Sequence, residues 1–294
     1  MFFYGLYLLG LLGAWLFPRR CAYWIAHRGA DFCYLRSAQD REAVRENLKS
    51  IFPDREISPS MVREVFRNFG MYLVDFFRFG RLTSDQLRKL VRLEGIEHME
   101  AALKEGKGVV GLTAHLGNFE LAGAVLALLG LPVNAVVLTH QNPRVNRFFL
   151  GQRERVGVKG IALDHSNWRG SYGDCVVALR RNEILALVGD RDFFDHGLAM
   201  PFFGKELKVP TGPAAFSVRT GAPIVPGFLV REKDDTYRFI LERPISIPEG
   251  LPREEMERKL LEQCLDHMAR YIRQYPTQWY MFQKFWSPGP ANIL

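Results

Sequence analysis

Residues 106–140 read GKGVVGLTAHLGNFELAGAVLALLGLPVNAVVLTH, and this stretch carries the clearest structural pattern in the chain. Residues 106–114 and 133–140 are short apolar runs of the kind found in buried parallel strands. Between them, residues 118–130 have the composition of a helix, with Asn118 as its N-cap and a glycine and a proline as stop signals. Two strands joined by a helix form a βαβ unit, which predicts a parallel sheet covered by helices.

Segments on both sides extend this pattern. We expect further strands at 183–190 and 222–230, and an alternating edge strand at 236–245. Residues 38–104 are predicted to be helical, and residues 254–276 to form a closing amphipathic helix. The predicted fold class is therefore α/β, with a mostly parallel central sheet flanked by helices.

The N-terminal residues 1–17 contain no charged side chain, and basic residues follow them. The stretch reads MFFYGLYLLGLLGAWLF and precedes Arg19, Arg20, Arg28 and Arg36. A helix of this length spans about 25 Å, close to the ~30 Å core of a bilayer. We expect a membrane-anchor helix that either spans the bilayer or lies in its interface, the alternative being a buried core helix. The order of the charges predicts that the rest of the chain lies on the cytoplasmic face of the membrane.

Composition narrows the range of partners. The chain has 294 residues, a formal net charge of +7 and 13% aromatic residues. A positive field favours an anionic membrane surface, phosphates or acidic proteins. The four cysteines include no C-x-x-C pair, which argues against a zinc knuckle or a disulfide scaffold. No nucleic-acid-binding module is recognisable, so we expect no nucleic acid partner.

The segment Thr113–Glu120 contains the most informative polar residues. His115 follows the carboxyl end of a predicted buried strand, where ligands bind in open α/β sheets. Glu120 lies in the first turn of the next helix, where the helix N-terminus stabilises a carboxylate. Because an ionised carboxylate beside an imidazole fixes its tautomer, we expect a dyad in which His115 is the general base and Glu120 orients its ring. The alternative is a buried core histidine.

The chain offers no obvious nucleophile for such a base to activate. A G-x-S-x-G elbow is absent, which argues against an α/β-hydrolase serine. H-E-x-x-H is also absent, and no other His or acidic cluster has metal spacing, so we expect no metal site. A base without an enzyme nucleophile suggests direct attack by a hydroxyl of the substrate.

Several blocks of the chain, in order, resemble the lipid A biosynthesis acyltransferases, the lauroyl and myristoyl transferases of Gram-negative envelopes. The blocks are residues 94–121 (EGIEHMEAALKEGKGVVGLTAHLGNFEL), 153–157 (RERVG), 184–192 (ILALVGDRD) and 200–228 (MPFFGKELKVPTGPAAFSVRTGAPIVPGF). This family belongs to the broader group of glycerol-phosphate and lysophospholipid acyltransferases. Together with the N-terminal apolar run, the resemblance covers nearly the whole chain.

The resemblance implies transfer of a fatty acyl chain from an acyl carrier protein or coenzyme A thioester to a hydroxyl of a lipid A precursor, a phosphorylated glycolipid. His115 would deprotonate this hydroxyl, which would attack the thioester directly without an acyl-enzyme or a cofactor. Backbone N–H groups near Asn118, or Arg169, would stabilise the oxyanion. Two alternatives stay open: an acyltransferase for another envelope glycolipid such as a phosphatidylinositol mannoside, and a non-catalytic lipid-binding membrane protein.

The resemblance also draws attention to the GDRD block. Asp190 falls where the family has an aspartate, whereas Arg191 replaces the usual glutamine. We expect Asp190, and Asp192 with it, to hold a catalytic-site arginine or to position the acceptor sugar. We also expect Arg191 and Asn118 to contact the substrate. The alternative is that an aspartate at a strand end simply caps the next turn.

A basic stretch and an apolar tunnel complete the predicted binding surfaces. Arg144, Arg147, Arg153 and Arg155 lie in a short segment with a single acid, and arginine suits phosphate groups or an acidic carrier protein. The alternative is a solvated basic helix face. An apolar tunnel beside His115 would hold the acyl chain.

The expected domain organisation follows from these assignments. Residues 1–20 are the membrane-anchor helix and residues 21–294 the acyltransferase domain. Within this domain we expect a helical part at 21–104, an α/β core at 105–247, and a C-terminal helix and tail at 248–294.

Overall fold

The computed structural model describes residues 2–139, 142–163, 168–192 and 196–286. The strands are β1 (Val91–Glu94), β2 (Val109–Thr113), β3 (Val133–Leu138), β4 (Val158–Leu163), β5 (Ile184–Val188), β6 (Leu198–Phe202), β7 (Lys205–Val209), β8 (Ile224–Arg231) and β9 (Tyr237–Leu241). The helices are α1 (Phe2–Leu16), α2 (Arg19–Arg36), α3 (Ala38–Ile51), α4 (Pro59–Phe79), α5 (Ser84–Leu90), α6 (Ile96–Lys104), α7 (Phe119–Leu128), α8 (Pro143–Glu154), α9 (Trp168–Arg180), α10 (Gly212–Thr220) and α11 (Arg253–Gln274). A short 3-10 helix, Pro276–Gln278, follows α11.

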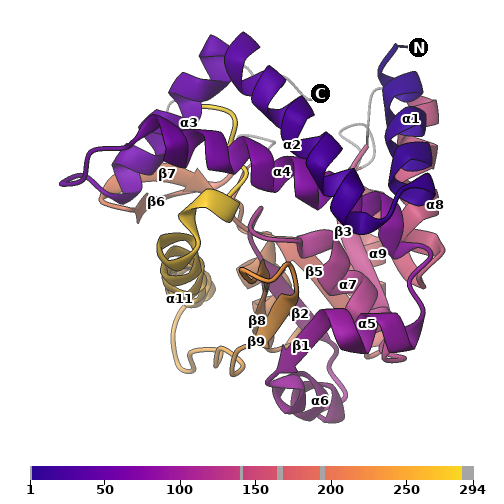
Figure 1. Cartoon of the computed structure of the whole chain (residues 1–294). Helices are drawn as coiled ribbons and strands as arrows, with labels where there is room; N and C mark the ends of the chain where they lie inside the picture. The colour runs from indigo at the N-terminus through magenta and orange to yellow at the C-terminus, as the bar shows by residue number, and fades with distance from the viewer. Residues whose placement is uncertain (1, 140–141, 164–167, 193–195, 287–294) are drawn as a thin grey trace.

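A seven-stranded sheet in the order β1-β9-β8-β2-β5-β3-β4 forms the centre of the protein (Figure 1). All neighbouring strands are parallel except β8 and β9, which are antiparallel. The predicted α/β class with a mostly parallel, helix-flanked sheet is therefore confirmed. β6 and β7 form a separate antiparallel hairpin.

Two predictions about the strands are wrong. The segment expected to be helical throughout, 38–104, contains β1, which pairs with β9 at the sheet edge. As a result, β9 is an interior strand and not the expected edge strand. Burial alternates along β9, and Tyr237, Phe239 and Leu241 are its buried residues. An interior strand can show this alternation when the two faces of the sheet differ in polarity.

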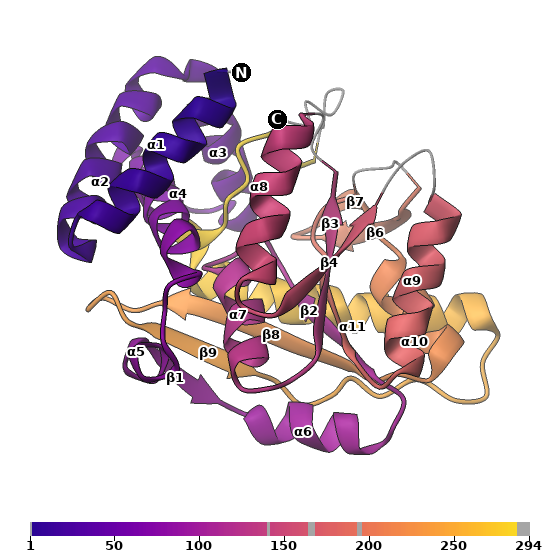
Figure 2. The same ribbon diagram turned by 90° about the vertical axis from the view of Figure 1, so that its right-hand side faces the viewer.

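Helices cover both faces of the sheet, and the strands supply side chains to each in alternation. In β8, Phe228 and Val230 join the core formed with α9, α10 and α11, whereas Val225 and Leu229 join the core formed with α6 and α7. Every residue of β8 is buried, as expected for a central strand covered on both sides. Figure 2 shows α7 and α8 in front of the sheet and α11 behind it.

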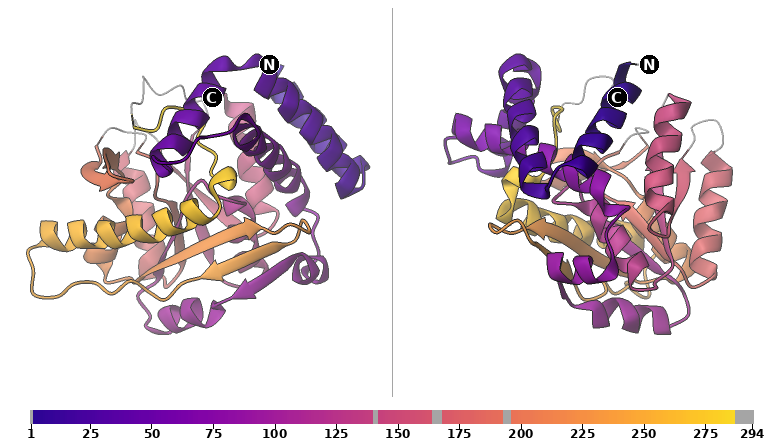
Figure 3. Two further views of the ribbon diagram at one scale, coloured as in Figure 1. Left: turned by 60° about the vertical axis from the view of Figure 1, so that its left-hand side comes forward. Right: turned by 45° about the vertical axis from the view of Figure 1, so that its right-hand side comes forward.

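The N-terminal helices α1–α4 form a separate layer across one end of the sheet (Figures 1 and 3). A buried carboxylate, Asp75 of α4, fixes this layer to the sheet. It accepts hydrogen bonds from the hydroxyls of Tyr23 in α2 and Tyr237 in β9, and Arg19 Nε donates to it at 3.0 Å. Because a buried carboxylate must be paired, these partners define where α2 and α4 meet the sheet.

The first helix packs against the protein along one side only. Leu11 and Ala14 are buried, while the side chains of Leu9, Leu12 and Leu16 are 66%, 51% and 76% exposed. Within the described part of the chain, no helix combines the length and apolar character needed to cross a membrane.

Candidate active site

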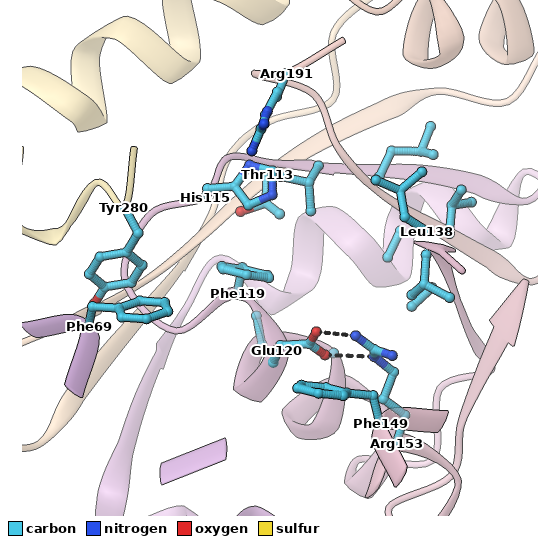
Figure 4. Close-up of a pocket in the computed structure, with 18 of the residues that line it drawn as sticks. Phe69, Thr113, His115, Phe119, Glu120, Leu138, Phe149, Arg153, Arg191 and Tyr280 are labelled. Carbon is cyan, nitrogen blue, oxygen red and sulfur yellow. Dashed lines mark hydrogen bonds and ion pairs between the residues drawn. The ribbon is translucent and has the colours of Figure 1, made fainter. Parts of the chain in front are cut away.

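A large, mostly apolar cavity of about 1740 Å³ lies between the helical layer and the sheet. Side chains from α1, α2, α4, α7 and the ends of β2, β3 and β5 line it. The polar groups on its walls include His115, Glu120, Arg153, Arg191 and Thr113 (Figure 4). Pockets that combine apolar walls with a few polar groups are the usual sites of ligand binding.

The strand register brings His115 and Asp190 together. β2 and β5 are adjacent parallel strands in which Thr113 pairs with Val188. His115 and Asp190 each follow two residues later, so both stand at the same level beyond the sheet. His115 Nδ1 lies 2.7 Å from Asp190 Oδ1, and the backbone N–H of His115 donates to Asp190 Oδ2 at 3.0 Å.

The surroundings of Asp190 keep it ionised. Its side chain is fully buried, and the indole Nε1 of Trp279 donates to its Oδ2 at 2.9 Å. Burial alone would raise the pKa of the Asp190 carboxyl, but the neighbouring His115 and the hydrogen bonds from His115 and Trp279 hold this pKa below its ordinary value. The carboxylate that engages His115 Nδ1 is therefore negatively charged at neutral pH.

Glu120 does not have the predicted partner. Both of its oxygens accept hydrogen bonds from Arg153 of α8, with Arg153 Nε to Oε2 at 2.9 Å, and both side chains are nearly buried. The prediction that Glu120 holds the His115 imidazole is wrong, because the carboxylate that contacts Nδ1 is that of Asp190. Figure 4 shows that the Glu120 side chain points toward Arg153.

The turn between His115 and α7 explains this difference. Gly117 has a φ of +62°, and a Cβ there would lie 2.0 Å from the carbonyl oxygen of Leu229. Only glycine fits this position. The chain therefore turns sharply, and α7 directs Glu120 along the cavity wall toward α8.

Asn118 has a structural role in place of the expected substrate contact. Its side chain is completely buried, its Oδ1 caps α7 by accepting from Leu121 N at 3.0 Å, and the predicted N-cap is thus confirmed. The N–H groups of Gly117 and Asn118 donate to Gln278 O and Leu229 O at 2.9 and 2.8 Å. These two amides are therefore already occupied and do not provide the expected oxyanion donors.

Arg191 and Asp192 both line the cavity, but they make different contacts. Figure 4 places the Arg191 side chain beside His115, and its Nη2 donates to Gln283 Oε1. Asp192 Oδ2 accepts a hydrogen bond from the N–H of Gly197 at 2.6 Å. Asp190, which was expected to hold an arginine or the acceptor sugar, contacts His115.

The basic stretch does not form one continuous surface. Arg153 points inward to Glu120, whereas Arg144, Arg147 and Arg155 are exposed on or next to α8. Arg155 also donates to Gln152 Oε1 at 2.9 Å. Arg169 lies in α9, but its side chain is outside the described residues, so its expected role is not addressed by the structure.

Sequence reasoning missed the C-terminal contribution to the site. Tyr280, Phe282 and Gln283 line the cavity, and Trp279 contacts Asp190. The aromatic run QWYMFQKFW was a visible signal, but nothing in it identifies which indole reaches a strand end. Among the described side chains, no group of three or more His, Cys, Asp or Glu residues is arranged to hold a metal ion.

A histidine that is partly exposed to an apolar cavity and is paired with a buried carboxylate, at the carboxyl end of a parallel sheet, is suited to an enzyme that acts on a lipid-like substrate. Comparison with known families agrees with this class. The chain belongs to the bacterial lipid A biosynthesis acyltransferase family, whose model matches residues 1–287, and it is therefore an acyltransferase.

Its relatives include enzymes with two kinds of glycolipid in their names. It is 26% identical over 261 residues to phosphatidylinositol mannoside acyltransferase of Mycolicibacterium smegmatis, covering 88% of this chain and 83% of that protein. It is 28% identical over 221 residues to lipid A biosynthesis palmitoleoyltransferase of Escherichia coli, covering 73% of this chain and 69% of that protein. A lipid A biosynthesis acyltransferase of Haemophilus influenzae is 22% identical, with coverages of 74% and 65%.

Proposed function

We propose that this protein is a membrane-associated O-acyltransferase that transfers a fatty acyl chain from an acyl carrier protein or coenzyme A thioester to a hydroxyl of a lipid A precursor. The observation that carries the proposal is the contact of His115 with Asp190 at the wall of the apolar cavity. A phosphatidylinositol mannoside as acceptor is supported about equally, because relatives of both kinds match this chain.

The Asp190 contact defines the chemistry of His115. Because the ionised carboxylate accepts the Nδ1–H of His115, the other ring nitrogen, Nε2, is the basic one. Nε2 takes the proton of the acceptor hydroxyl while this oxygen bonds to the thioester carbonyl carbon. The tetrahedral intermediate then collapses, the carbon–sulfur bond breaks, and the imidazolium returns the proton to the leaving thiolate. The products are an ester and a free thiol, and no acyl-enzyme forms.

Arg191 is the proposed stabiliser of the intermediate in place of the amides near Asn118. Its guanidinium lies beside His115, where negative charge develops on the former carbonyl oxygen. A hydrogen-bond donor in such a position commonly stabilises the transition state by about 3 kcal/mol. The hydrogen bond to Gln283 supports the side chain from the C-terminal segment.

The apolar part of the cavity is the proposed site of the acyl chain. It continues from His115 between α7 and the sheet, where Gly111, Ala135 and Ala186 leave room beside Leu126 and Phe239. Burial of ~10 methylenes would contribute roughly 8 kcal/mol at about 0.8 kcal/mol for each. The length of this space would select the length of the chain that is transferred.

The exposed apolar side chains of the N-terminal layer support association with a membrane on its cytoplasmic face. Besides the leucines of α1, Trp24, Phe32 and Leu35 of α2 are 61%, 58% and 71% exposed. Arg28 lies over the Trp24 ring at 5.2 Å and Arg36 over the Phe32 ring at 5.1 Å. Aromatic and basic residues together are typical of helices that lie in the membrane interface. Both helices also line the cavity, so lipid substrates would enter from this side.

The proposal is tested by assaying purified protein with a labelled acyl thioester. Donors carried by acyl carrier protein and by coenzyme A are each combined with a lipid A precursor or a phosphatidylinositol mannoside. We expect transfer to one acceptor and a loss of at least about 100-fold in His115→Ala. His267→Gln in α11 is the matched control, since this histidine contacts Arg270 and lies outside the cavity. Undiminished transfer by His115→Ala would refute the proposed mechanism.

A further inference from the structure

The segment after α11 runs directly along the chain that carries His115. Leu116 and Trp279 form an antiparallel bridge. The N–H of Tyr280 donates to His115 O, and the N–H of Gly117 donates to Gln278 O, each at 2.9 Å. Residues 277–286, which we call the C-terminal segment, are thus paired through the backbone with the catalytic histidine.

Buried amide side chains fix the C-terminal segment to the helical layer. Asn47 of α3 is 2% exposed; its Nδ2 donates to Met281 O and Gln283 O at 3.0 and 2.8 Å, and its Oδ1 accepts from Phe285 N at 3.0 Å. Asn68 of α4 donates to Thr277 O at 3.0 Å. Hydrogen bonds of buried amides are costly to disrupt, so the segment has a defined position.

This position presents the indole of Trp279 to Asp190. The two carboxylate oxygens have different partners: Oδ1 faces His115 Nδ1 at 2.7 Å, whereas Oδ2 accepts both from Trp279 Nε1 at 2.9 Å and from His115 N at 3.0 Å. A carboxylate can rotate about its Cβ–Cγ bond. The two donors on Oδ2 oppose this rotation and keep Oδ1 directed at the imidazole.

We propose that Trp279 is a positioning residue of the His115–Asp190 pair, through which the C-terminal segment sets the orientation of the general base. This inference deepens the proposed function and rests on it. Trp279 does not line the cavity and is 2% exposed, so it acts through Asp190 and not on the substrate.

The test compares two tryptophans of the same segment. Trp279→Phe removes the donor to Asp190, while Trp286→Phe removes an indole N–H that donates to the backbone oxygen of Phe202 at 3.1 Å. Both variants lose the same atoms. We expect Trp279→Phe to lower kcat about ten- to a hundredfold with KM changed less than about twofold, as for loss of one hydrogen bond to a charged group. Trp286→Phe should keep kcat within about twofold of the wild type.

A second measurement needs no substrate and separates this inference from the proposed function. The Nδ1 proton of a histidine bonded to a carboxylate gives a low-field NMR signal, which is assigned here by its absence in His115→Gln. We expect Trp279→Phe to shift or broaden this signal and Trp286→Phe to leave it unchanged. An unchanged signal in Trp279→Phe, or equal changes in both variants, would overturn the inference. If the wild type transferred no acyl chain to either acceptor, the proposed function would fail, while the NMR comparison would still decide the contact.

Discussion

The cavity has two acidic corners, and their surroundings differ. At the end of β5, Asp190 faces a histidine and an indole. At the start of α7, Glu120 is bound through both oxygens by Arg153. In the first corner the carboxylate is hydrogen-bonded to the proposed base, His115. In the second corner the charge of the carboxylate is neutralised by an ion pair with Arg153. The difference shows that closeness in sequence to His115 does not select its partner; the neighbouring strand does.

The largest effect is expected at the β5 corner. Asp190→Asn replaces the anionic acceptor of His115 Nδ1 with an amide, which removes its charge and can favour the wrong imidazole tautomer. We expect kcat to fall about 10³- to 10⁴-fold, measured by thioester consumption and product formation. Asp174→Asn, an exposed position on α9, is the control. If Asp190→Asn retained more than a tenth of the activity, the assignment of the two corners would have to be reversed.

The α7 corner should respond less, and in a different way. Burial lowers the pKa of the Arg153 guanidinium, but its ion pair with Glu120 raises this pKa above the ordinary value. Glu120→Gln therefore leaves a buried cation without its charge partner. Breaking a buried pair by removing one partner costs about 3–5 kcal/mol of stability. We expect a lower melting temperature and a roughly ten- to hundredfold loss of activity through the distorted wall.

The double variant Glu120→Gln, Arg153→Met sharpens this comparison. Removal of both charges should restore part of the stability lost in Glu120→Gln, because no uncompensated charge stays buried. Thermal unfolding and initial rates of the two variants measure this. Equal loss of activity in Glu120→Gln and Asp190→Asn, without rescue by the second substitution, would instead indicate that Glu120 acts on the reaction directly.

The smallest effect on catalysis is expected at a carboxylate outside both corners. Asp31 of α2 accepts hydrogen bonds from Arg67 and Arg63 of α4, which hold the pKa of Asp31 well below its ordinary value. Asp31→Asn should lower the melting temperature by roughly a few degrees and leave kcat within about twofold.

The pH dependence of this stability difference has a defined sign. A lowered folded-state pKa stabilises the protein above the ordinary aspartate pKa of about 4, and this contribution is lost as the pH falls through the lowered value. The melting temperatures of the wild type and Asp31→Asn should therefore differ by a constant amount from pH 7 to pH 5 and converge below about pH 4. A difference that grows with acidification would contradict the role of the Asp31 pairs.

Local sequence patterns predicted the parts of the fold that depend on neighbouring residues. The βαβ unit, the Asn118 N-cap and the closing helix α11 each follow from apolar period and capping chemistry within one segment. β1 was missed because VRLE is too short to show a period, and its pairing depends on β9, far along the chain. His115 and its position at a strand end were likewise visible from the sequence.

The partners of the site could not be predicted, because they come from distant segments. Asp190 contacts His115 only because β5 lies next to β2 in the sheet, although β3 and β4 lie between them in the chain. The spacing of His115 and Glu120 suggested a pair, but the glycine turn at Gly117 separates their directions. Trp279 arrives from beyond α11, and no local pattern links it to Asp190.

The backbone pairing of Trp279 with Leu116 also orders events during synthesis. A nascent chain that has emerged through α11 already contains His115 and Asp190, but it lacks the C-terminal segment that contacts them. Folding of the central sheet can therefore precede the final alignment of the base, and the apolar helices α1 and α2 emerge before either. On the ribosome, the exposed apolar side chains of α1 and α2 would therefore emerge long before the segment that completes the proposed site.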